Sequence, residues 1–418
     1  MNVEIVTIGN EVLSGRTLDT NFAFLARLLE EASVQVVWHS TVGDAQERIA
    51  EGLKRALDRA DAVVMTGGLG PTPDDITRKA VATVLGRPLL LDEGVLASIR
   101  ERGKRHGRRL PATVETMALI PRGAEVWPNP VGAAPGLLVL HRDKPVILLP
   151  GVPEEMEALA REHAVPYLRG RGGRAIETFT LRTYGSFESQ LHERIGALPD
   201  AWPGASLAYL PSYFGVDLRV TVTGVNPVTV RETRLRAYNE LMAKVGPVVY
   251  AEGGVAMEEV LGAILVEKGW RIATAESCTG GLLAKRLNDV PGASRYVERG
   301  FVTYSNAAKL EVLGVDAATL EAQGAVSAAV AEQMARGARG RSGVEVGVGI
   351  TGVAGPEGGS ESKPVGLVFV AGSSPLGDFV RLLRFQGTRP TVRERAAQTA
   401  MDLLRRHLLG LAVDAALD

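Results

Sequence analysis

Short apolar runs that are closely followed by glycine, with helical patterns between them, most constrain the fold of this chain. In the first part of the sequence the predicted strands are residues 3–8, 34–42, 62–66 and 146–149, each closely followed by glycine. Alternation of strands and helices is typical of a mostly parallel sheet covered by helices. The sequence therefore predicts an α/β domain over residues 1–170, with ligands bound at the carboxyl ends of its strands.

The order of predicted elements changes after this domain and then changes back. Residues 174–251 read as strand, helix, two strands, helix and a short strand, which predicts a small α+β module. Residues 255–418 alternate again and predict a second α/β domain. Its last strands, at 345–350, 365–371 and 379–385, have connections too short for parallel crossovers, so we expect antiparallel pairing there. Glycine-rich stretches at 170–173 and 252–254 are the predicted boundaries.

Composition excludes several classes of protein. A hydrophobic fraction of 45% and a formal net charge of −1 exclude a disordered chain and argue against a globally basic nucleic-acid binder. The basic cluster at residues 100–109 is interpreted as a solvated surface. The single cysteine, Cys278, excludes an intrachain disulfide. With no apolar run of membrane-spanning length and no signal peptide pattern, we expect a cytoplasmic protein without a membrane partner.

A loop at residues 66–77 combines glycines with two carboxylates directly after a buried strand. Glycines there let a ligand approach the backbone and leave N–H groups for an anion. Pro73 stands where a dinucleotide fingerprint needs its third glycine. Asp74 and Asp75 follow, and helix capping could explain one of them. Because Mg²⁺ is held by one or two carboxylates plus phosphate oxygens, the grouping predicts a metal–phosphate site.

Other carboxylates lie at neighbouring strand ends. Glu11 follows the first strand, Asp19 opens the next helix and Asp44 follows the second strand. Each alone is explained by an ordinary turn, but parallel strand ends share one edge of a sheet, which favours convergence. The candidate metal ligands are therefore Asp75, Asp44, Asp74, Glu11 and Asp19.

Several motifs in this half carry a family resemblance, at residues 8–15, 19–21, 42–44, 66–72 and 150–156. In these motifs the chain resembles the amino-terminal half of the CinA (competence/damage-inducible) family. The resemblance implies a MoaB/MogA-like three-layer α/β fold and a metal-dependent ADP-ribose pyrophosphatase that uses Mg, Mn or Co. It further implies substrate contacts from Asn21, Thr66, Gly67, Gly68, Gly70, Gly151 and Glu154.

A second group of reactive residues lies in the last domain, in the stretch 275–281 between a strand and a helix. We expect Ser277 at the helix N-terminus, where the dipole favours an alkoxide, although a serine there is also an ordinary cap. The amides of Thr279, Gly280 and Gly281 are candidate oxyanion donors. Cys278 is a competing nucleophile with no histidine nearby in sequence.

Lys309 lies just after the next strand, in the pattern Tyr304-Ser305-Asn306-x-x-Lys309. Neighbouring parallel strands end at one edge, so we expect Lys309 to reach Ser277. A lysine beside apolar walls loses pKa and can act as a general base, although an isolated surface lysine has the same spacing. The glycine-rich loop at 349–360 follows a third buried strand and could bind an anion.

The motifs 276–281, 300–306, 324–327 and 351–356, together with Lys309, resemble the carboxyl-terminal CinA domain and stand-alone nicotinamide mononucleotide deamidases. The resemblance implies amide hydrolysis with release of ammonia and no cofactor. It implies catalytic roles for Ser277, Lys309, Tyr304 and Thr279, and substrate contacts from Glu276, Gly280, Gly281, Ser305, Asn306, Thr351, Gly352, Ala354 and Gly355. The middle module is similar to the KH-type insert of the family, and it has no Gly-x-x-Gly loop to support RNA binding.

These expectations combine into a homodimeric enzyme of pyridine-nucleotide salvage. Its carboxyl-terminal site would convert nicotinamide mononucleotide to nicotinic acid mononucleotide. Its amino-terminal site would cleave ADP-ribose to AMP and ribose 5-phosphate. Two alternatives stay open at this point: a binding protein of DNA uptake or repair, and a molybdopterin-binding protein with an accessory domain.

Overall fold

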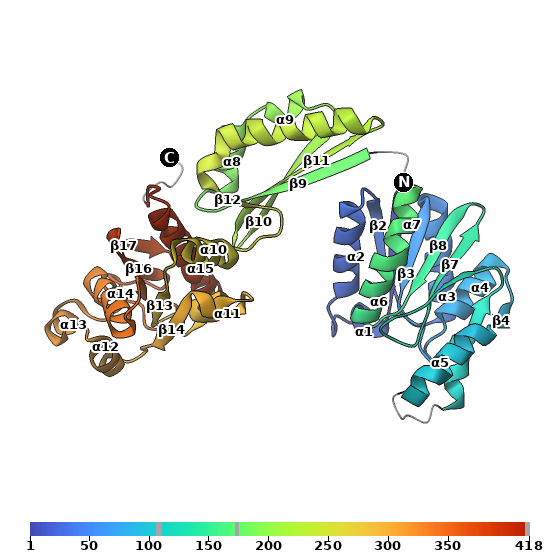
Figure 1. Ribbon diagram of the computed structural model, residues 1–418, viewed down its shortest axis with the longest axis horizontal. Coiled ribbons are helices and arrows are strands. Elements are labelled where there is room, and N and C mark those ends of the chain that lie inside the picture. The colour runs from blue at the N-terminus through green and yellow to red at the C-terminus, as the bar shows by residue number, and fades with distance from the viewer. Residues whose placement is uncertain (106–110, 172–174, 414–418) are drawn as a thin grey trace. The chain divides into compact units, whose positions relative to one another are not determined.

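The structure is a computed structural model that describes residues 1–105, 111–171 and 175–413 (Figure 1). Part of the basic cluster at 100–109 and part of the predicted boundary at 170–173 lie outside the described residues. The described chain divides into two compact units. One holds Met1–Thr178 with Val222–Thr233, and the other holds Phe179–Thr221 with the chain from Arg234 onward. Most of the middle module therefore belongs to the same unit as the carboxyl-terminal domain.

A six-stranded sheet with the order β2-β1-β3-β8-β7-β6 forms the centre of the amino-terminal domain. Its strands are β1 (Asn2–Ile8), β2 (Gln35–Val42), β3 (Ala62–Thr66), β6 (Glu125–Trp127), β7 (Gly136–His141) and β8 (Lys144–Leu149). Strands β2, β1, β3 and β8 are parallel, as predicted, and β7 and β6 add an antiparallel edge. A separate pair, β4 (Leu89–Leu91) and β5 (Leu119–Pro121), is also antiparallel.

Helices cover both faces of this sheet (Figure 1). They are α1 (Asn10–Leu13), α2 (Thr20–Glu31), α3 (Gln46–Arg59), α4 (Thr77–Leu85), α5 (Glu93–Arg105), α6 (Pro153–Leu159) and α7 (Val165–Gly170). Val3 and Ile5 of β1 pack in one core with α2 and α6, whereas Val6 and Ile8 pack in the other with α3 and α4. As expected for a central parallel strand covered on both faces, every residue of β1 from Val3 to Ile8 is buried, including the polar Glu4 and Thr7. The result is the predicted three-layer arrangement.

The middle module is a four-stranded sheet with the order β10-β11-β9-β12, covered by two helices. Its elements are β9 (Ala175–Thr183), α8 (Glu188–Ile195), β10 (Ala205–Ser212), β11 (Gly215–Gly224), α9 (Pro227–Val245) and β12 (Val249–Glu252). Along β11 buried and half-buried residues alternate, as expected for a sheet with one covered face.

A five-stranded sheet with the order β14-β13-β15-β16-β17 forms the carboxyl-terminal domain. Its strands are β13 (Ile272–Glu276), β14 (Val297–Val302), β15 (Val346–Gly352), β16 (Leu367–Ser374) and β17 (Gly377–Arg384). Its helices are α10 (Met257–Lys268), α11 (Leu282–Asp289), α12 (Asn306–Leu313), α13 (Ala317–Gln323), α14 (Ala328–Ser342) and α15 (Arg389–Leu408). Strands β14, β13 and β15 are parallel, and β15, β16 and β17 pair antiparallel, as their short connections predicted.

Short helical segments complete the chain: η1 (Ala112–Ala118), η2 (Ala160–Ala164), η3 (Leu198–Ala201), η4 (Gly246–Val248) and η5 (Ala293–Arg295). Within the described residues, no helix combines the length and the apolar character needed to cross a membrane.

The close approach of α14 to β15 requires glycine in the strand. A Cβ at Gly349 would meet the carbonyl oxygen of Ala331 and would lie 2.8 Å from the Ala335 nitrogen, whereas one at Gly340 would meet nothing within 4 Å. We expect Gly349→Ala to lower the free energy of unfolding by about 1–3 kcal/mol through overpacking. The matched change Gly340→Ala should raise it by about 0.5–1 kcal/mol, because alanine favours the helix. Thermal unfolding of the two variants measures both effects, and equal shifts of the same sign would contradict this packing.

Candidate active sites

Ser277 is held where the carboxyl ends of three parallel strands meet. It directly follows β13, and its N–H donates to the Ile350 carbonyl of β15 at 3.0 Å. On the other side, the Thr303 N–H after β14 donates to the Glu276 carbonyl at 2.9 Å. Backbone hydrogen bonds to both neighbouring strands therefore fix the position of the serine, which is only 9% exposed.

Lys309 reaches this serine from the first turns of α12 and is fully buried. Its Nζ lies 3.1 Å from Ser277 Oγ and donates to the carbonyl oxygens of Thr303, at 2.8 Å, and Tyr304, at 3.2 Å. Burial lowers the pKa of the Lys309 amine below its usual value. No carboxylate takes part in these hydrogen bonds.

These three contacts are compatible with an uncharged amine. A neutral amine has two N–H donors and one lone pair, whereas an ammonium has three donors and no acceptor. The two carbonyls can take the two donors, which leaves the lone pair directed at the Ser277 hydroxyl. With the amine neutral, the Ser277 hydroxyl donates a hydrogen bond to the lone pair of Lys309 Nζ. A general base requires this geometry before it takes the proton.

Glu276 binds the helix start rather than leaving it open to substrate. Its carboxylate accepts from the amides of Gly281, Leu283 and Ala284 at 2.8–3.0 Å. Helix α11 begins only at Leu282, so Ser277 precedes the helix and is not at its N-terminus as we predicted. The physical reason is that the carboxylate satisfies the free amides of the first turn and completes the turn between strand and helix.

The predicted oxyanion donors are therefore partly occupied. The Gly281 amide binds Glu276, and the Gly280 amide donates to the Ser277 carbonyl at 3.1 Å. The Thr279 hydroxyl, by contrast, is fully buried and has no hydrogen-bond partner among the described residues. The Thr279 carbonyl is held by two nitrogens of Arg393, at 2.7 and 3.1 Å.

The segment that follows β14 contributes mainly through its backbone. Tyr304 is 60% exposed, and its hydroxyl accepts from Arg389 at 2.9 Å. Ser305 caps α12, since its Oγ accepts from the Ala308 amide at 3.1 Å, and Asn306 is an exposed first-turn residue. These residues thus lie close to Lys309 along the chain, but the Ser305 side-chain oxygen is already used to cap the helix.

The third predicted motif begins at the end of β15. The Thr351 hydroxyl donates to the Ala325 carbonyl at 2.8 Å, and Ala354 is buried in the core. Gly352 packs against the backbone of β16, where a Cβ would lie 2.6 Å from the Leu367 carbonyl oxygen. The Gly355 carbonyl accepts from Arg389 at 2.9 Å, so Arg389 links this loop to Tyr304.

Cys278 is a poor candidate for the nucleophile in this setting. Burial raises the pKa of its thiol to about 11, and the Glu276 charge adds to the rise. The thiol is therefore protonated near neutral pH, and only the thiolate is a strong nucleophile.

A cavity of about 760 Å³ lies beside the glycine loop of the amino-terminal domain. The loop contributes Gly68, Gly70 and Asp75 to its lining, and Arg102 and Glu155 lie on other walls, as does Gly151. Burial raises the pKa of the Glu155 carboxyl. Glu154, which we predicted at this site, is exposed, whereas its neighbour Glu155 is half-buried.

Polar contacts from behind hold the backbone segments that line this cavity. Asn21 donates to the Thr66 hydroxyl at 3.0 Å and to the Gly151 carbonyl at 2.9 Å, and its own Oδ1 is buried without a partner. Gly67 has a φ of 111°, and a Cβ there would collide with the Ile8 carbonyl oxygen, so only glycine fits. Arg78, buried behind the loop, donates to the Leu69 and Gly70 carbonyls at 2.5 and 3.2 Å. Burial lowers the pKa of Arg78 to about 10.

The five predicted metal ligands do not gather into one cluster. Asp75 lines the cavity. Its Oδ2 accepts hydrogen bonds from the Thr72 N–H at 2.8 Å and from the Thr72 hydroxyl at 2.5 Å. Asp44 accepts from the Asn10 amide at 2.9 Å, and Asp19 caps α2 and pairs with His39 at 3.1 Å. Asp74 and Glu11 are exposed. Across the described ranges, no three His, Cys, Asp or Glu side chains lie close enough to hold a metal ion.

Sequence reasoning missed the arginines that border both sites. Arg389 and Arg393 lie on the first turns of α15, far along the chain from Ser277, and Arg102 lies on α5 in the basic cluster that we interpreted as a solvated surface. Their helical spacing carried no sign of which side chains point inward. Glu155 was missed for a related reason, since its neighbour in the same motif was the one selected.

Comparison with known proteins decides the family. A "CinA-like protein" of Gemmatimonas aurantiaca is 43% identical over 413 residues, which cover 97% of this chain and 96% of that protein. A "Putative competence-damage inducible protein" of Symbiobacterium thermophilum is 42% identical over 425 residues, covering 98% and 99%. The chain belongs to the CinA family.

The CinA family descriptions account for all three parts of the chain. Residues 4–170 match the family described as "Probable molybdopterin binding domain", 178–251 match "Damage-inducible protein CinA KH domain", and 255–408 match "CinA C-terminal domain". The predicted MoaB/MogA-like, KH-type and CinA domains are confirmed in that order.

Solved structures resemble parts of the chain. One is titled a protein "CinA with unknown function" from Thermoplasma acidophilum, 42% identical, with a TM-score of 0.37; the match covers 39% of this chain and 97% of that one. Another is the molybdopterin biosynthesis enzyme MoaB of Thermus thermophilus, 23% identical, with a TM-score of 0.28; that match covers 40% and 96%.

Proposed function

We propose that the Ser277–Lys309 pair hydrolyses the carboxamide of nicotinamide mononucleotide to the acid, with release of ammonia. The observation that carries this proposal is the fully buried Lys309 amine 3.1 Å from Ser277 Oγ. A buried lysine without a carboxylate partner is destabilised as a cation, which makes it suited to accept the serine proton.

The reaction proceeds in two halves through an ester on the serine. Ser277 Oγ attacks the amide carbon while Lys309 takes the hydroxyl proton. Lys309 then passes that proton to the amide nitrogen, so that the C–N bond breaks and ammonia departs. A water molecule then attacks the ester carbon while Lys309 accepts a proton from it. Lys309 returns that proton to Ser277 Oγ as the bond between the acyl carbon and Oγ breaks, which forms the carboxylic acid and restores the free serine and the neutral amine. The unpartnered Thr279 hydroxyl can donate to the oxyanion of either tetrahedral intermediate.

The surroundings of the pair favour a phosphorylated substrate. Arg389 and Arg393 contact Tyr304 and Thr279, so two permanent positive charges lie next to the site. A phosphate group complements this charge, because guanidinium and phosphate form strong charge-assisted hydrogen bonds. This supports a nucleotide as substrate in preference to free nicotinamide.

Ser277→Ala and Cys278→Ala separate the two possible nucleophiles. We expect Ser277→Ala to lose more than the ~10²–10³-fold in ammonia release that one oxyanion donor contributes, and Cys278→Ala to stay active. Lys309→Met should lose as much as Ser277→Ala, and the double variant little more, because the pair acts as a unit. Full activity of Ser277→Ala together with an inactive Cys278→Ala would overturn the assignment.

The same pair predicts the direction of the pH dependence. The active form of Lys309 is the neutral amine, so kcat/KM should rise with pH until Lys309 has lost its proton. Since burial lowers the Lys309 pKa, kcat/KM should stop rising at a pH below the ordinary lysine pKa of 10.5. A rate that falls across this range in wild-type protein would contradict the neutral-lysine mechanism.

For the amino-terminal cavity we propose that it cleaves the pyrophosphate bond of ADP-ribose, which yields AMP and ribose 5-phosphate. The carboxylates of Asp75 and Glu155 line one cavity with Arg102 and the glycine loop, which fits a Mg²⁺, Mn²⁺ or Co²⁺ ion held by one or two carboxylates and substrate phosphates. When bound, such a cation neutralises phosphate charge. Asp75 and Glu155 would hold it, and Arg102 would bind the phosphate oxygens.

Chelation and a single substitution test this second proposal. Pyrophosphatase activity should vanish with a chelator and return with divalent ions. Asp75→Asn should lower the activity strongly while ammonia release from the other domain is unchanged. The exposed Asp74→Asn is the matched control and should have a much smaller effect. Undiminished turnover after chelation would contradict a metal-dependent reaction.

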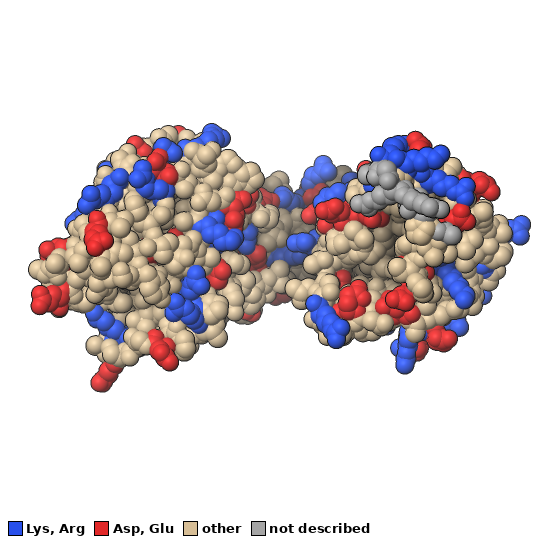
Figure 2. Space-filling model, turned by 90° about the horizontal axis from the view of Figure 1, so that it is seen from below, with Lys and Arg blue, Asp and Glu red and all other residues tan. Residues whose placement is uncertain are grey.

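The match to a molybdopterin-binding domain keeps one alternative for this cavity. A bound pterin would be detected by its fluorescence on titration of the protein, in the absence of any ADP-ribose cleavage. Nucleic acid is disfavoured as a partner, because Lys and Arg are interspersed with Asp and Glu on the face in Figure 2. Self-association into a homodimer stays a prediction, which light scattering measures.

A further inference from the structure

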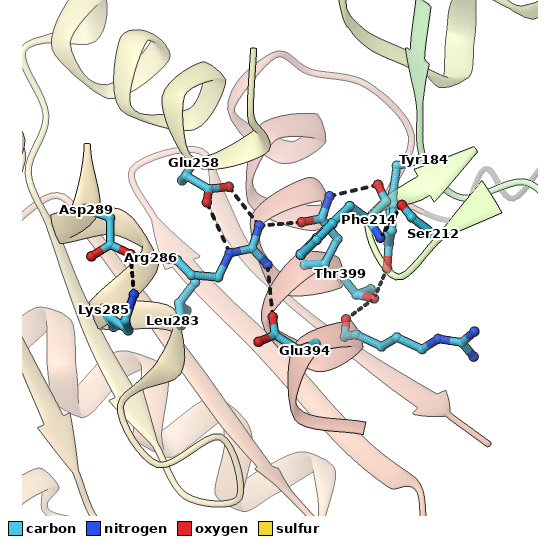
Figure 3. Close-up of polar contacts among 12 residues, drawn as sticks. Tyr184, Ser212, Phe214, Glu258, Leu283, Lys285, Arg286, Asp289, Glu394 and Thr399 are labelled. Carbon is cyan, nitrogen blue, oxygen red and sulfur yellow. Dashed lines mark hydrogen bonds and ion pairs between the residues drawn. The ribbon is translucent and has the colours of Figure 1, made fainter. Parts of the chain in front are cut away.

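A turn of the middle module lies against two helices of the carboxyl-terminal domain (Figure 3). This docking turn, residues 212–215, joins β10 to β11. Within it, the Phe214 amide donates to Ser212 Oγ at 3.1 Å, and the Phe214 carbonyl accepts from Gln398 of α15 at 3.2 Å. The turn is thus ordered by its own contact and bound by a side chain of the other domain.

Arg286 of α11 is the centre of this contact. Its side chain is 9% exposed and binds Glu258 at 2.7 and 3.3 Å and Gln398 at 2.7 Å. The Phe214 ring covers the guanidinium with its centroid 4.9 Å away. Glu394 lies 3.9 Å from the remaining nitrogen. The guanidinium charge is therefore neutralised by acids of its own domain, but it is shielded from water by a ring of the middle module.

Gln398 connects the two sides and is fully buried. Its oxygen accepts from Arg286 while its nitrogen donates to the docking turn, so both ends of the amide are used. Next to it, the hydroxyl of the partly buried Tyr184 of the middle module lies 2.6 Å from the Thr399 hydroxyl, which itself donates to the Arg395 carbonyl. Burial raises the pKa of Tyr184 to about 12, so its phenol stays a donor. Side chains of α15 therefore hold two separate points of the module.

The same two helices reach the Ser277 site with their first turns. The first amides of α11 bind Glu276, the residue before Ser277. The first turns of α15 carry Arg389 and Arg393, which hold the Tyr304 hydroxyl and the Thr279 carbonyl. A shift of α11 would therefore move Glu276, and a shift of α15 would move the segments of Thr279 and Tyr304, all of which lie close to Ser277 along the chain or in space.

We propose that the docking turn positions the Ser277 site, with Arg286, Gln398 and Phe214 as positioning residues that lock α11 against α15. The kinetic part of this proposal rests on the proposed amidase function, whereas the docking itself does not.

Phe214→Ala in the full chain is the main test, with Tyr213→Ala as the matched control. Tyr213 is the neighbouring aromatic of the same turn and is 50% exposed. Loss of the desolvated cation–π contact should speed hydrogen exchange of the α11 amides about tenfold in Phe214→Ala. Ammonia release should fall about five- to tenfold in kcat with little change in KM. Phe214→Tyr keeps a ring over Arg286 and should restore both readouts.

Gln398→Met provides a second test from the other side, because it keeps the size of the side chain and removes both hydrogen bonds. It should reproduce the kcat loss of Phe214→Ala, and the combined variant should lose little more than either alone. Unchanged exchange in α11 and unchanged kcat for Phe214→Ala would overturn the proposal, as would equal effects of Tyr213→Ala. If wild-type protein releases no ammonia, the amidase proposal fails, and the exchange rates alone decide whether the turn locks α11.

Discussion

The contact between the buried Lys309 amine and the Ser277 hydroxyl is the interaction on which the proposed chemistry of the carboxyl-terminal domain depends. An ammonium at that depth would need a carboxylate, because an unpaired buried charge costs several kcal/mol. The structure offers two carbonyls and a hydroxyl instead. Such surroundings favour the neutral amine, and a neutral amine beside a serine is a base beside a nucleophile.

The sheet topology explains how these two residues come together. Strands β14, β13 and β15 are adjacent and parallel, so the segments that follow them leave the sheet at one edge. Glu276 then fastens the turn after β13 to the start of α11, and Arg389 and Arg393 fasten the start of α15 to the segments after β13, β14 and β15. Rigid elements on three sides hold the serine in one position, which is what a catalytic pair requires.

Much of this arrangement was predictable from the sequence, and the failures have physical causes. The shared edge of parallel strands indicated that Lys309 could reach Ser277, and the family resemblance assigned the two residues their catalytic roles. The role of Glu276 at the helix start was not predicted, because it depends on α11 beginning at Leu282 rather than near Ser277. The carboxylates of the amino-terminal domain were expected to converge, but Asp44 and Asp19 are used to bind backbone amides of nearby segments. Glu155 rather than Glu154 faces the cavity because adjacent helical residues point about 100° apart.

The proposed amidase mechanism requires that Ser277 become covalently attached to the substrate's acyl group. Rapid acid quenching of full-length protein mixed with nicotinamide mononucleotide, followed by peptide mass spectrometry, measures this directly. We predict a mass increase equal to the substrate less ammonia on the peptide that contains Ser277, assigned to the serine by fragmentation and absent from Ser277→Ala. The same adduct on Cys278, or turnover with no adduct on either residue under conditions in which hydrolysis of the ester is rate-limiting, would contradict it.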